Sequence, residues 1–272
     1  MERLAILKKI PIWLYFSIVS FFLVLPFLSI IIWSFTKLWP WPALIPDVMN
    51  NDSWTYLFSP SGKAVVGLIN SVTVAFITVF GCVALGLPAA RILSQKQFFG
   101  KGFVFITLLC PLFIPLTVSV MGLYDVTIRL KFLNEYLCVA IAHILVTLPY
   151  FIAMVAYQYK LLGLSQQEAA RSLEAGFWQI IFWIELPQIL PALLLSCLFV
   201  IIISFCQYLP TWIMSGGTLL TLPLIIFPFA SSSNTSMVSA YSIWLFIPIM
   251  AFVLVYFLLL AKLHHRKEGV KS

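Results

Sequence analysis

Charged residues are scarce in this sequence: Asp, Glu, Lys and Arg make up 9% of its 272 residues, whereas 62% of the residues are hydrophobic. In soluble domains about a quarter of all residues carry a charge. A chain with so few charges and a mean hydropathy of +1.06 cannot cover an ordinary water-facing surface, so the composition indicates an integral membrane protein. Each helical span needs roughly 20 apolar residues, and the length therefore allows about six spans and no separate soluble domain.

Motifs for enzyme chemistry are also lacking. A phosphate-binding loop needs Gly-Lys followed by Ser or Thr, but the Gly-Lys pairs at 62–63 and 100–101 are followed by Ala and Gly. HExxH, GxSxG and paired carboxylates within apolar runs are absent too, so we expect no catalytic residue, no metal and no cofactor bound by this chain. The five cysteines lie in apolar runs without CxxC spacing, which predicts core residues. The net charge of +7 sits at the ends of apolar runs, which argues against a nucleic-acid partner.

Long uncharged runs mark the membrane spans. They predict one helix each at about 12–35, 64–90, 102–124, 136–159, 188–209 and 237–261. The last uncharged stretch is too long for one span and is divided by Pro210, the glycine pair at 216–217 and the polar run at 231–236. The apolar piece at 219–229 is too short to cross and is predicted to be interfacial or re-entrant. The sequence thus predicts one all-α membrane domain over 1–272.

The distribution of Lys and Arg predicts the orientation. Most of the 16 basic residues lie near the two ends of the chain, at 91–101 and at 160–171, and the positive-inside rule places these segments in the cytoplasm. Both termini are therefore predicted to be cytoplasmic, which six spans permit. The opposite side holds Lys37, Lys63, Arg129 and Lys131. The Trp- and Pro-rich stretch at 36–63 is predicted to lie outside, where indole rings suit the headgroup level.

The cytoplasmic loop at 160–187 contains signals for helices. Ser165 and Glu168 have the spacing of a capping box, which predicts a short helix with Ser165 at its N-cap. Along this helix Arg171 is spaced to form i,i+3 ion pairs with Glu168 and Glu174.

A second apolar helical piece is predicted to follow a turn at Gly176 and to end at Pro187, before the fifth span. Two short helices that expose small alanines, Ala169 and Ala170, suit a groove on a partner protein. A solvated amphipathic loop without a partner is the alternative.

This loop resembles the EAA loop of permease subunits in binding-protein-dependent ATP-binding-cassette (ABC) importers, through the stretch Glu168-Ala169-Ala170-Arg171-Ser172-Leu173-Glu174-Ala175-Gly176 followed by Leu186-Pro187. Such permeases carry similar short sequence motifs in the same order. In this chain the motifs are Asn70-Ser71, Gly86 to Arg91, Ala142-His143, Leu148-Pro149-Tyr150, Gly216-Gly217-Thr218 and Thr221-Leu222-Pro223. The family usually has Gly directly before Ala175, where this chain has Glu174, and we therefore expect the turn between the two helices to shift to Gly176.

The resemblance implies a MetI-like permease with six transmembrane helices in a bacterial cytoplasmic (inner) membrane. It implies three partners: a cytoplasmic ABC ATPase dimer that binds ATP and Mg²⁺, a second permease subunit, identical or related, and a periplasmic or lipid-anchored solute-binding protein. The ATPase-coupling residues that it implies are Ser165, Glu168, Ala169, Ala170, Leu173, Gly176, Leu186 and Pro187. The Gly-Gly-Thr and Thr-Leu-Pro motifs most resemble those of the permease branch that transports ferric iron, polyamines, sulfate or thiamine.

Polar side chains within the predicted spans are candidates for a solute path, because burying them in lipid is costly. These candidates are Asn70, Thr73, His143, Gln207 and Tyr208. Alternatively, such side chains only hold helices together. Asp125 and Arg129 stand one helical turn apart and are expected to form an ion pair at the rim of the third span.

Two other function classes stay open at this point. An ion-coupled secondary carrier would show an internal repeat with paired broken helices, and no such repeat is visible. An intramembrane lipid-modifying enzyme, with His143 or Asp125 as its reactive group, would need several convergent ionisable residues.

Overall fold

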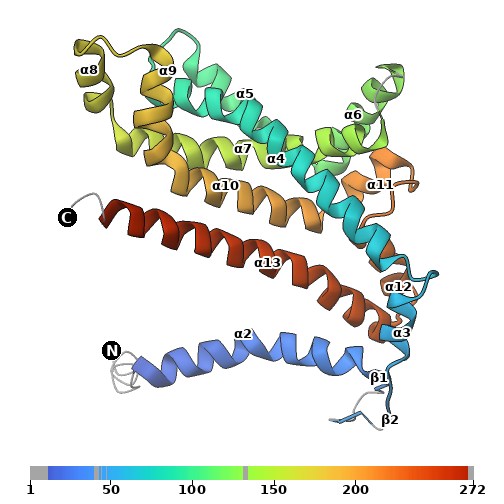
Figure 1. Cartoon of the computed structure of the whole chain (residues 1–272). Coiled ribbons are helices and arrows are strands. Elements are labelled where there is room, and N and C mark those ends of the chain that lie inside the picture. The colour runs from blue at the N-terminus through green and yellow to red at the C-terminus, as the bar shows by residue number, and fades with distance from the viewer. Residues whose placement is uncertain (1–11, 40–42, 44, 47, 131–133, 269–272) are drawn as a thin grey trace, which may run out of the picture. The chain divides into compact units, whose positions relative to one another are not determined.

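The computed structural model describes residues 12–39, 43, 45–46, 48–130 and 134–268. Within this part, five helices are long and apolar enough to cross a membrane, and a bent helix pair makes a sixth span if it is counted as one (Figure 1). The five are α2 (Ile12–Ser34), α4 (Ala64–Gln95), α7 (Glu135–Leu162), the run that ends with α10 (Leu186–Cys206), and α13 (Thr235–Glu268). The all-α membrane class is confirmed, whereas the side of both termini stays a prediction and Lys131 lies outside the described residues.

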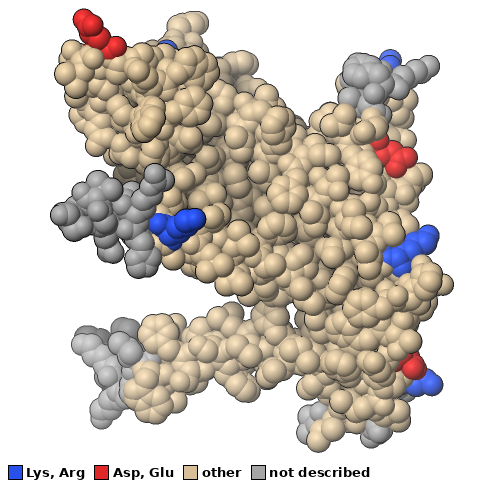
Figure 2. All heavy atoms as spheres, in the orientation of Figure 1, with Lys and Arg blue, Asp and Glu red and all other residues tan. Residues whose placement is uncertain are grey.

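On the face drawn in Figure 2 charged side chains are few, and most of them lie near its margins. Many large hydrophobic side chains are exposed on the isolated chain, and most of α2 is exposed along its length. Such a surface fits contact with lipid or with another protein. Cys110 and Cys206 also face outwards, so the expectation that all five cysteines are core residues is wrong for these two. An apolar helix face turned to lipid accepts a thiol as readily as a core does.

The chain divides into two compact units. The first consists of Met1–Ala64 and Ile226–Phe246, and the second of Val65–Ile225 and Ile247–Ser272. Besides α2, the first unit holds the two-stranded ribbon of β1 (Thr36–Leu38) and β2 (Val48–Met49), α3 (Asp52–Phe58) and part of α12 (Leu222–Ser231). Its buried Tyr241 donates a 2.6 Å hydrogen bond to the Gly62 carbonyl. This bond ties the beginning of α13 to the turn before α4.

The core of the second unit is built around α7, which is the most buried of the long helices. Phe151 and Val155 of α7 pack with Cys82 of α4 and Ile189 of α10. The helices approach closely where α4 carries glycine: a Cβ at Gly86 would lie 2.5 Å from the Phe151 ring. Small residues permit such close packing between membrane helices.

The third span differs from the prediction. Instead of one helix at 102–124, the structure has α5 (Lys101–Phe113) and α6 (Leu116–Leu130), which are bent by 106° relative to each other. Ile114, between them, has an extended backbone with φ −87° and ψ 136°. The following residue is Pro115, and proline disfavours the helical conformation in the residue before it. Pro115 thus breaks a run that is apolar enough for a continuous span.

The fifth span is longer than predicted. It runs without a break from Phe177 to Cys206 through α9 (Phe177–Gln179), the π-helical segment η1 (Ile180–Glu185) and α10. Pro187 therefore does not end the preceding helical piece, and the prediction of a break there is wrong. The π turns shift the hydrogen-bonding pattern by one residue just before the position at which Pro187 cannot donate.

Candidate functional site

The short helix predicted in the loop at 160–187 is present as α8 (Ser165–Ser172). Ser165 is its first residue and not its cap: the N-cap is Leu164, whose carbonyl accepts the Glu168 amide at 2.9 Å. The predicted capping box is therefore wrong, because the helix starts one residue earlier than the Ser–Glu spacing requires. Neither predicted ion pair of Arg171 forms among the described residues, where the salt bridges are those of Arg91 and Arg129.

The turn after α8 lies at Glu174 and not at Gly176. Glu174 has φ +59°, its amide donates to the Arg171 carbonyl at 2.9 Å, and the Ala175 amide donates to the Ala170 carbonyl at 3.0 Å. These two bonds form a Schellman motif with Glu174 at the left-handed position, which glycine usually fills. Gly176 instead has φ −68° and begins α9, with its amide donating to Oε1 of Gln179 at 2.7 Å. The expected shift of the turn is thus wrong, and the chain accepts a strained Glu.

The outer surface of α8 is partly apolar. Glu168 and Ala169 are exposed, and Leu173 at the C-cap is 83% exposed. Ala170, in contrast, is buried, so only one of the two alanines predicted to face a partner is accessible. The reason is the helical period: Gln167 and Ala170 share the face that turns towards the chain, one turn apart.

A buried ion pair anchors the loop to α4. Nη2 of Arg91 lies 2.6 Å from Oε1 of Glu185, whose side chain is fully buried. The Arg91 guanidinium also lies 5.0 Å from the ring centroid of Phe177. The sequence interpretation missed this pair, although a single Glu inside a long apolar run was a usable signal, because such a charge needs a partner.

Glutamine side chains make further connections. Nε2 of Gln188 donates to Oε1 of Gln166 and to the Ile184 carbonyl, and Nε2 of Gln158 donates to the Gln188 carbonyl at 3.4 Å. Through Gln188, these contacts join the fifth span both to α8 and to α7. The implied coupling residues Leu186 and Pro187 lie at the start of α10, where Leu186 packs on the core cluster and Pro187 is exposed.

The polar candidates of the spans form networks inside the second unit. His143 is buried, with Nδ1 at 2.8 Å from Oγ of Ser204 and Nε2 at 3.0 Å from Oγ1 of Thr211. The imidazole thereby joins α7, α10 and α11 (Leu209–Ser215). Both ring nitrogens have partners within the chain, so a role in connecting these helices is enough to explain the buried His143.

Asn70 also connects separate segments. Its Nδ2 donates to the Leu220 carbonyl at 2.8 Å, and its Oδ1 accepts from the Tyr136 hydroxyl at 2.8 Å. Thr73 bonds within α4, to the Ile69 carbonyl at 2.8 Å.

Gln207 is buried at the break between α10 and α11, and Tyr208 beside it is half-buried. A role in lining a solute path stays a prediction for these two residues and for the other polar candidates. Asp125 and Arg129 form the expected ion pair at 3.0 Å, with both side chains largely exposed.

Known proteins resemble the chain in sequence, although no family model matches it. It is 25% identical over 248 residues to the arabinooligosaccharides transport system permease protein AraQ of Halalkalibacterium halodurans. The matched region covers 86% of this chain and 87% of that protein. It is also 25% identical to the spermidine/putrescine transport system permease protein PotB of Haemophilus influenzae, with 92% and 93% of the two chains covered.

Solved structures share the fold. A chain of a bacterial ABC transporter that imports the acidic polysaccharide alginate matches with a TM-score of 0.62, at 17% identity over 93% of this chain and 95% of that one. The same kind of transporter in complex with an alginate pentasaccharide-bound periplasmic protein matches with a TM-score of 0.64, at 16% identity over 94% and 93%. The chain is thus similar in sequence to transport-system permease proteins, and it shares the fold of a chain of a bacterial ABC importer; both findings agree with the spans and the loop described above.

Proposed function

We propose that this chain forms one half of a transport path and receives ATP-driven movement through its loop at 160–187. The loop and both termini lie in the cytoplasm. The loop docks on an ABC ATPase dimer, and it is this dimer, not the permease chain, that binds ATP and Mg²⁺. A second permease subunit, identical or related, completes the path. A soluble or lipid-anchored binding protein delivers a small solute from outside, in line with the periplasmic protein bound to one fold neighbour.

The observation that carries this proposal is the contrast between the two sides of α8. Its inner side is fixed by buried Ala170, by the Gln166–Gln188 hydrogen bond and by the turn at Glu174. Its outer side exposes Ala169 and Leu173, a small and an apolar residue that water does not favour. A rigid short helix with such an outer side suits a groove on a partner protein.

Exposed apolar helices support a second permease subunit. The most apolar stretch of α2 has no buried residue, little of α13 is buried, and α5 has none that is buried. Lipid can cover such faces, but a path for a polar solute needs a wall on its other side as well. A single chain of this size gives one wall, which favours an oligomer.

The contacts of the loop define a route for movement. A push on α8 reaches α10 through Gln188 and reaches α4 through the Arg91–Glu185 pair. Since α4, α7 and α10 pack in one core, the spans respond together. ATP shifts the equilibrium only in so far as the closed ATPase dimer binds the loop better in one orientation of the spans than in the other.

Charged substitutions on α8 test the proposal. Ala169→Asp and Leu173→Asp each place a charge on the exposed side, and the ATPase should no longer copurify because an unpaired charge would be buried at the contact. Ser232→Asp is the matched control: it adds the same charge at an exposed position predicted to lie outside. Tagged chains are purified from native membranes, and the eluate is assayed for ATP hydrolysis and for a P-loop subunit by mass spectrometry.

The remaining α8 positions refine this test. Ala170→Asp should damage the loop itself, since Ala170 is buried. Glu168 makes no side-chain hydrogen bond or ion pair with the described residues, so loss of the ATPase in Glu168→Ala would report a contact with the partner. Unchanged ATPase recovery and solute uptake in both Ala169→Asp and Leu173→Asp would refute the role of this loop.

A further inference from the structure

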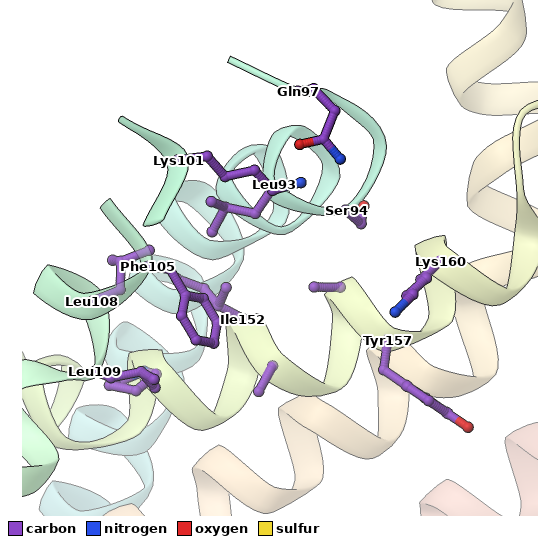
Figure 3. Close-up of a pocket in the computed structure, with 13 residues that line it drawn as sticks. Leu93, Ser94, Gln97, Lys101, Phe105, Leu108, Leu109, Ile152, Tyr157 and Lys160 are labelled. Atoms are coloured by element: carbon purple, nitrogen blue, oxygen red, sulfur yellow. The ribbon is translucent and has the colours of Figure 1, made fainter. Parts of the chain in front are cut away.

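A cavity of about 560 Å³ opens among α4, α5 and α7 in the second unit. Figure 3 shows Ser94, Gln97 and Lys160 around one end of it and Phe105, Leu108 and Leu109 around the other. The cavity is therefore amphipathic, with polar and cationic groups at one end and apolar side chains at the other.

The charge of the lining is positive. Lys101 and Lys160 contribute two ammonium groups, and no Asp or Glu is among the described residues that line the cavity. Lys101 donates one hydrogen bond, to the Lys96 carbonyl at 3.0 Å, which leaves two of its three N–H donors for a ligand. Neither lysine takes part in a salt bridge with the described residues. Two uncompensated ammonium groups at one cavity favour an anionic ligand.

The position of these groups matches the edge of a bilayer. Lys101 is the first residue of α5, Lys160 is in the last turn of α7, and Ser94 is next to the last residue of α4. Three helices thus contribute polar groups at their ends.

The apolar end of the cavity lies deeper in the spans. The helical rise amounts to about 10 Å from Lys101 to Leu108 along α5 and to about 12 Å from Lys160 to Ile152 along α7. That depth corresponds to the step from a lipid phosphate to the upper part of an acyl chain.

We propose that this cavity binds one anionic phospholipid. The phosphate group lies between Lys101 and Lys160, the hydroxyl and amide groups of Ser94 and Gln97 bind the rest of the headgroup, and an acyl chain runs along Phe105 and Ile152. A soluble anion would use the lysines but would leave the apolar end empty, and a neutral lipid would leave the ammonium groups unpaired.

The site has a consequence for α5. No residue of this helix is buried in the isolated chain, although Leu108 packs against the core cluster. A lipid between α5 and α7 fixes the first half of the broken third span against the helix that leads directly into α8. The proposal of a lipid here does not rest on the proposed docking of an ATPase.

Lipid retention by the purified full-length chain tests this inference. The chain is solubilised in detergent with equal amounts of phosphatidylglycerol and phosphatidylcholine, and bound lipid is counted by native mass spectrometry. The unmodified chain should retain one phosphatidylglycerol in preference to phosphatidylcholine. The Lys101→Gln/Lys160→Gln variant should bind it about 25-fold more weakly, because each basic side chain near anionic lipid contributes about fivefold.

Two further variants separate the causes. Lys63→Gln/Lys262→Gln removes two exposed charges that do not line the cavity and should retain the lipid. Ala156→Phe keeps both lysines and fills the cavity, so it should also lose the lipid. Equal retention in the two lysine variants, retention by Ala156→Phe, or displacement of the lipid by millimolar inorganic phosphate would each overturn the proposal.

Discussion

The buried ion pair between Arg91 and Glu185 leads to a large and testable energetic effect. Glu185 is fully buried, whereas the Arg91 side chain is 19% exposed. Removing one partner of a buried pair leaves an uncompensated charge, which costs about 3–5 kcal/mol. Arg91→Leu should therefore destabilise the folded chain by about that amount. Glu185→Gln should cost less, because Arg91 keeps some contact with water and with the face of Phe177.

The double variant Arg91→Leu/Glu185→Leu isolates the pair. It removes both charges, and apolar replacements for a buried ion pair are often close to neutral, so most of the loss should be recovered. Asp125→Asn is the matched control, since it breaks the exposed pair with Arg129 and should change stability by about 1 kcal/mol or less.

The assay is thermal unfolding in detergent, monitored by intrinsic fluorescence. Recovery of the ATPase with the purified chain is measured as well. For a chain of this size, a loss of about 3–5 kcal/mol corresponds to a drop of roughly 10 °C in the unfolding midpoint. A midpoint for Arg91→Leu equal to that of Asp125→Asn, or a double variant as unstable as the sum of the single ones, would refute the reasoning.

Three further predictions concern topology, the polar network and the turn. Cysteine labelling in sealed vesicles should reach 40–60 and 212–235 from outside, and 92–100, 162–184 and the C-terminus from inside; outside access to 162–184 would exclude ATPase docking there. His143→Leu and Gln207→Leu should lower solute uptake with the ATPase still bound if they line the path, and normal uptake by both would leave them as helix connectors. Glu174→Gly should stabilise the loop by up to about 1 kcal/mol and preserve docking, whereas Glu174→Val should weaken both, as unfolding and ATPase recovery would reveal.

The number and type of spans could be predicted because crossing a bilayer is a property of consecutive residues. The first span is predicted at 12–35 from uncharged length alone, and α2 ends at Ser34, one residue before that limit; its other end coincides with the first described residue. The errors occur at prolines, where the outcome depends on the backbone around them. Pro115 breaks the third span, whereas Pro187 lies inside the fifth, after π turns that composition cannot reveal.

The position of the coupling loop could be predicted, but its internal geometry could not. The motif located α8 within the loop at 160–187. The N-cap prediction failed because Ser165 at the first helical position has the same sequence spacing as Ser165 at the cap. The turn prediction failed for a related reason: the intrinsic cost of a left-handed Glu is about 1–2 kcal/mol, and the surrounding hydrogen bonds at Glu174 outweigh it.

The Arg91–Glu185 pair marks the limit of such inference most clearly. The two residues are 94 positions apart, so no local pattern connects them. Sequence does dictate that a Glu within a 30-residue apolar helix needs a cationic partner, and that the partner must come from a span end at the same depth. The packing of the helices determines that this partner is Arg91 and not another basic residue on that side. Because α4 approaches α7 closely, the end of α4 that carries Arg91 lies next to the π-helical segment. The link between loop and span is thus set by the core, and a substitution in that core should affect coupling as strongly as one in the loop.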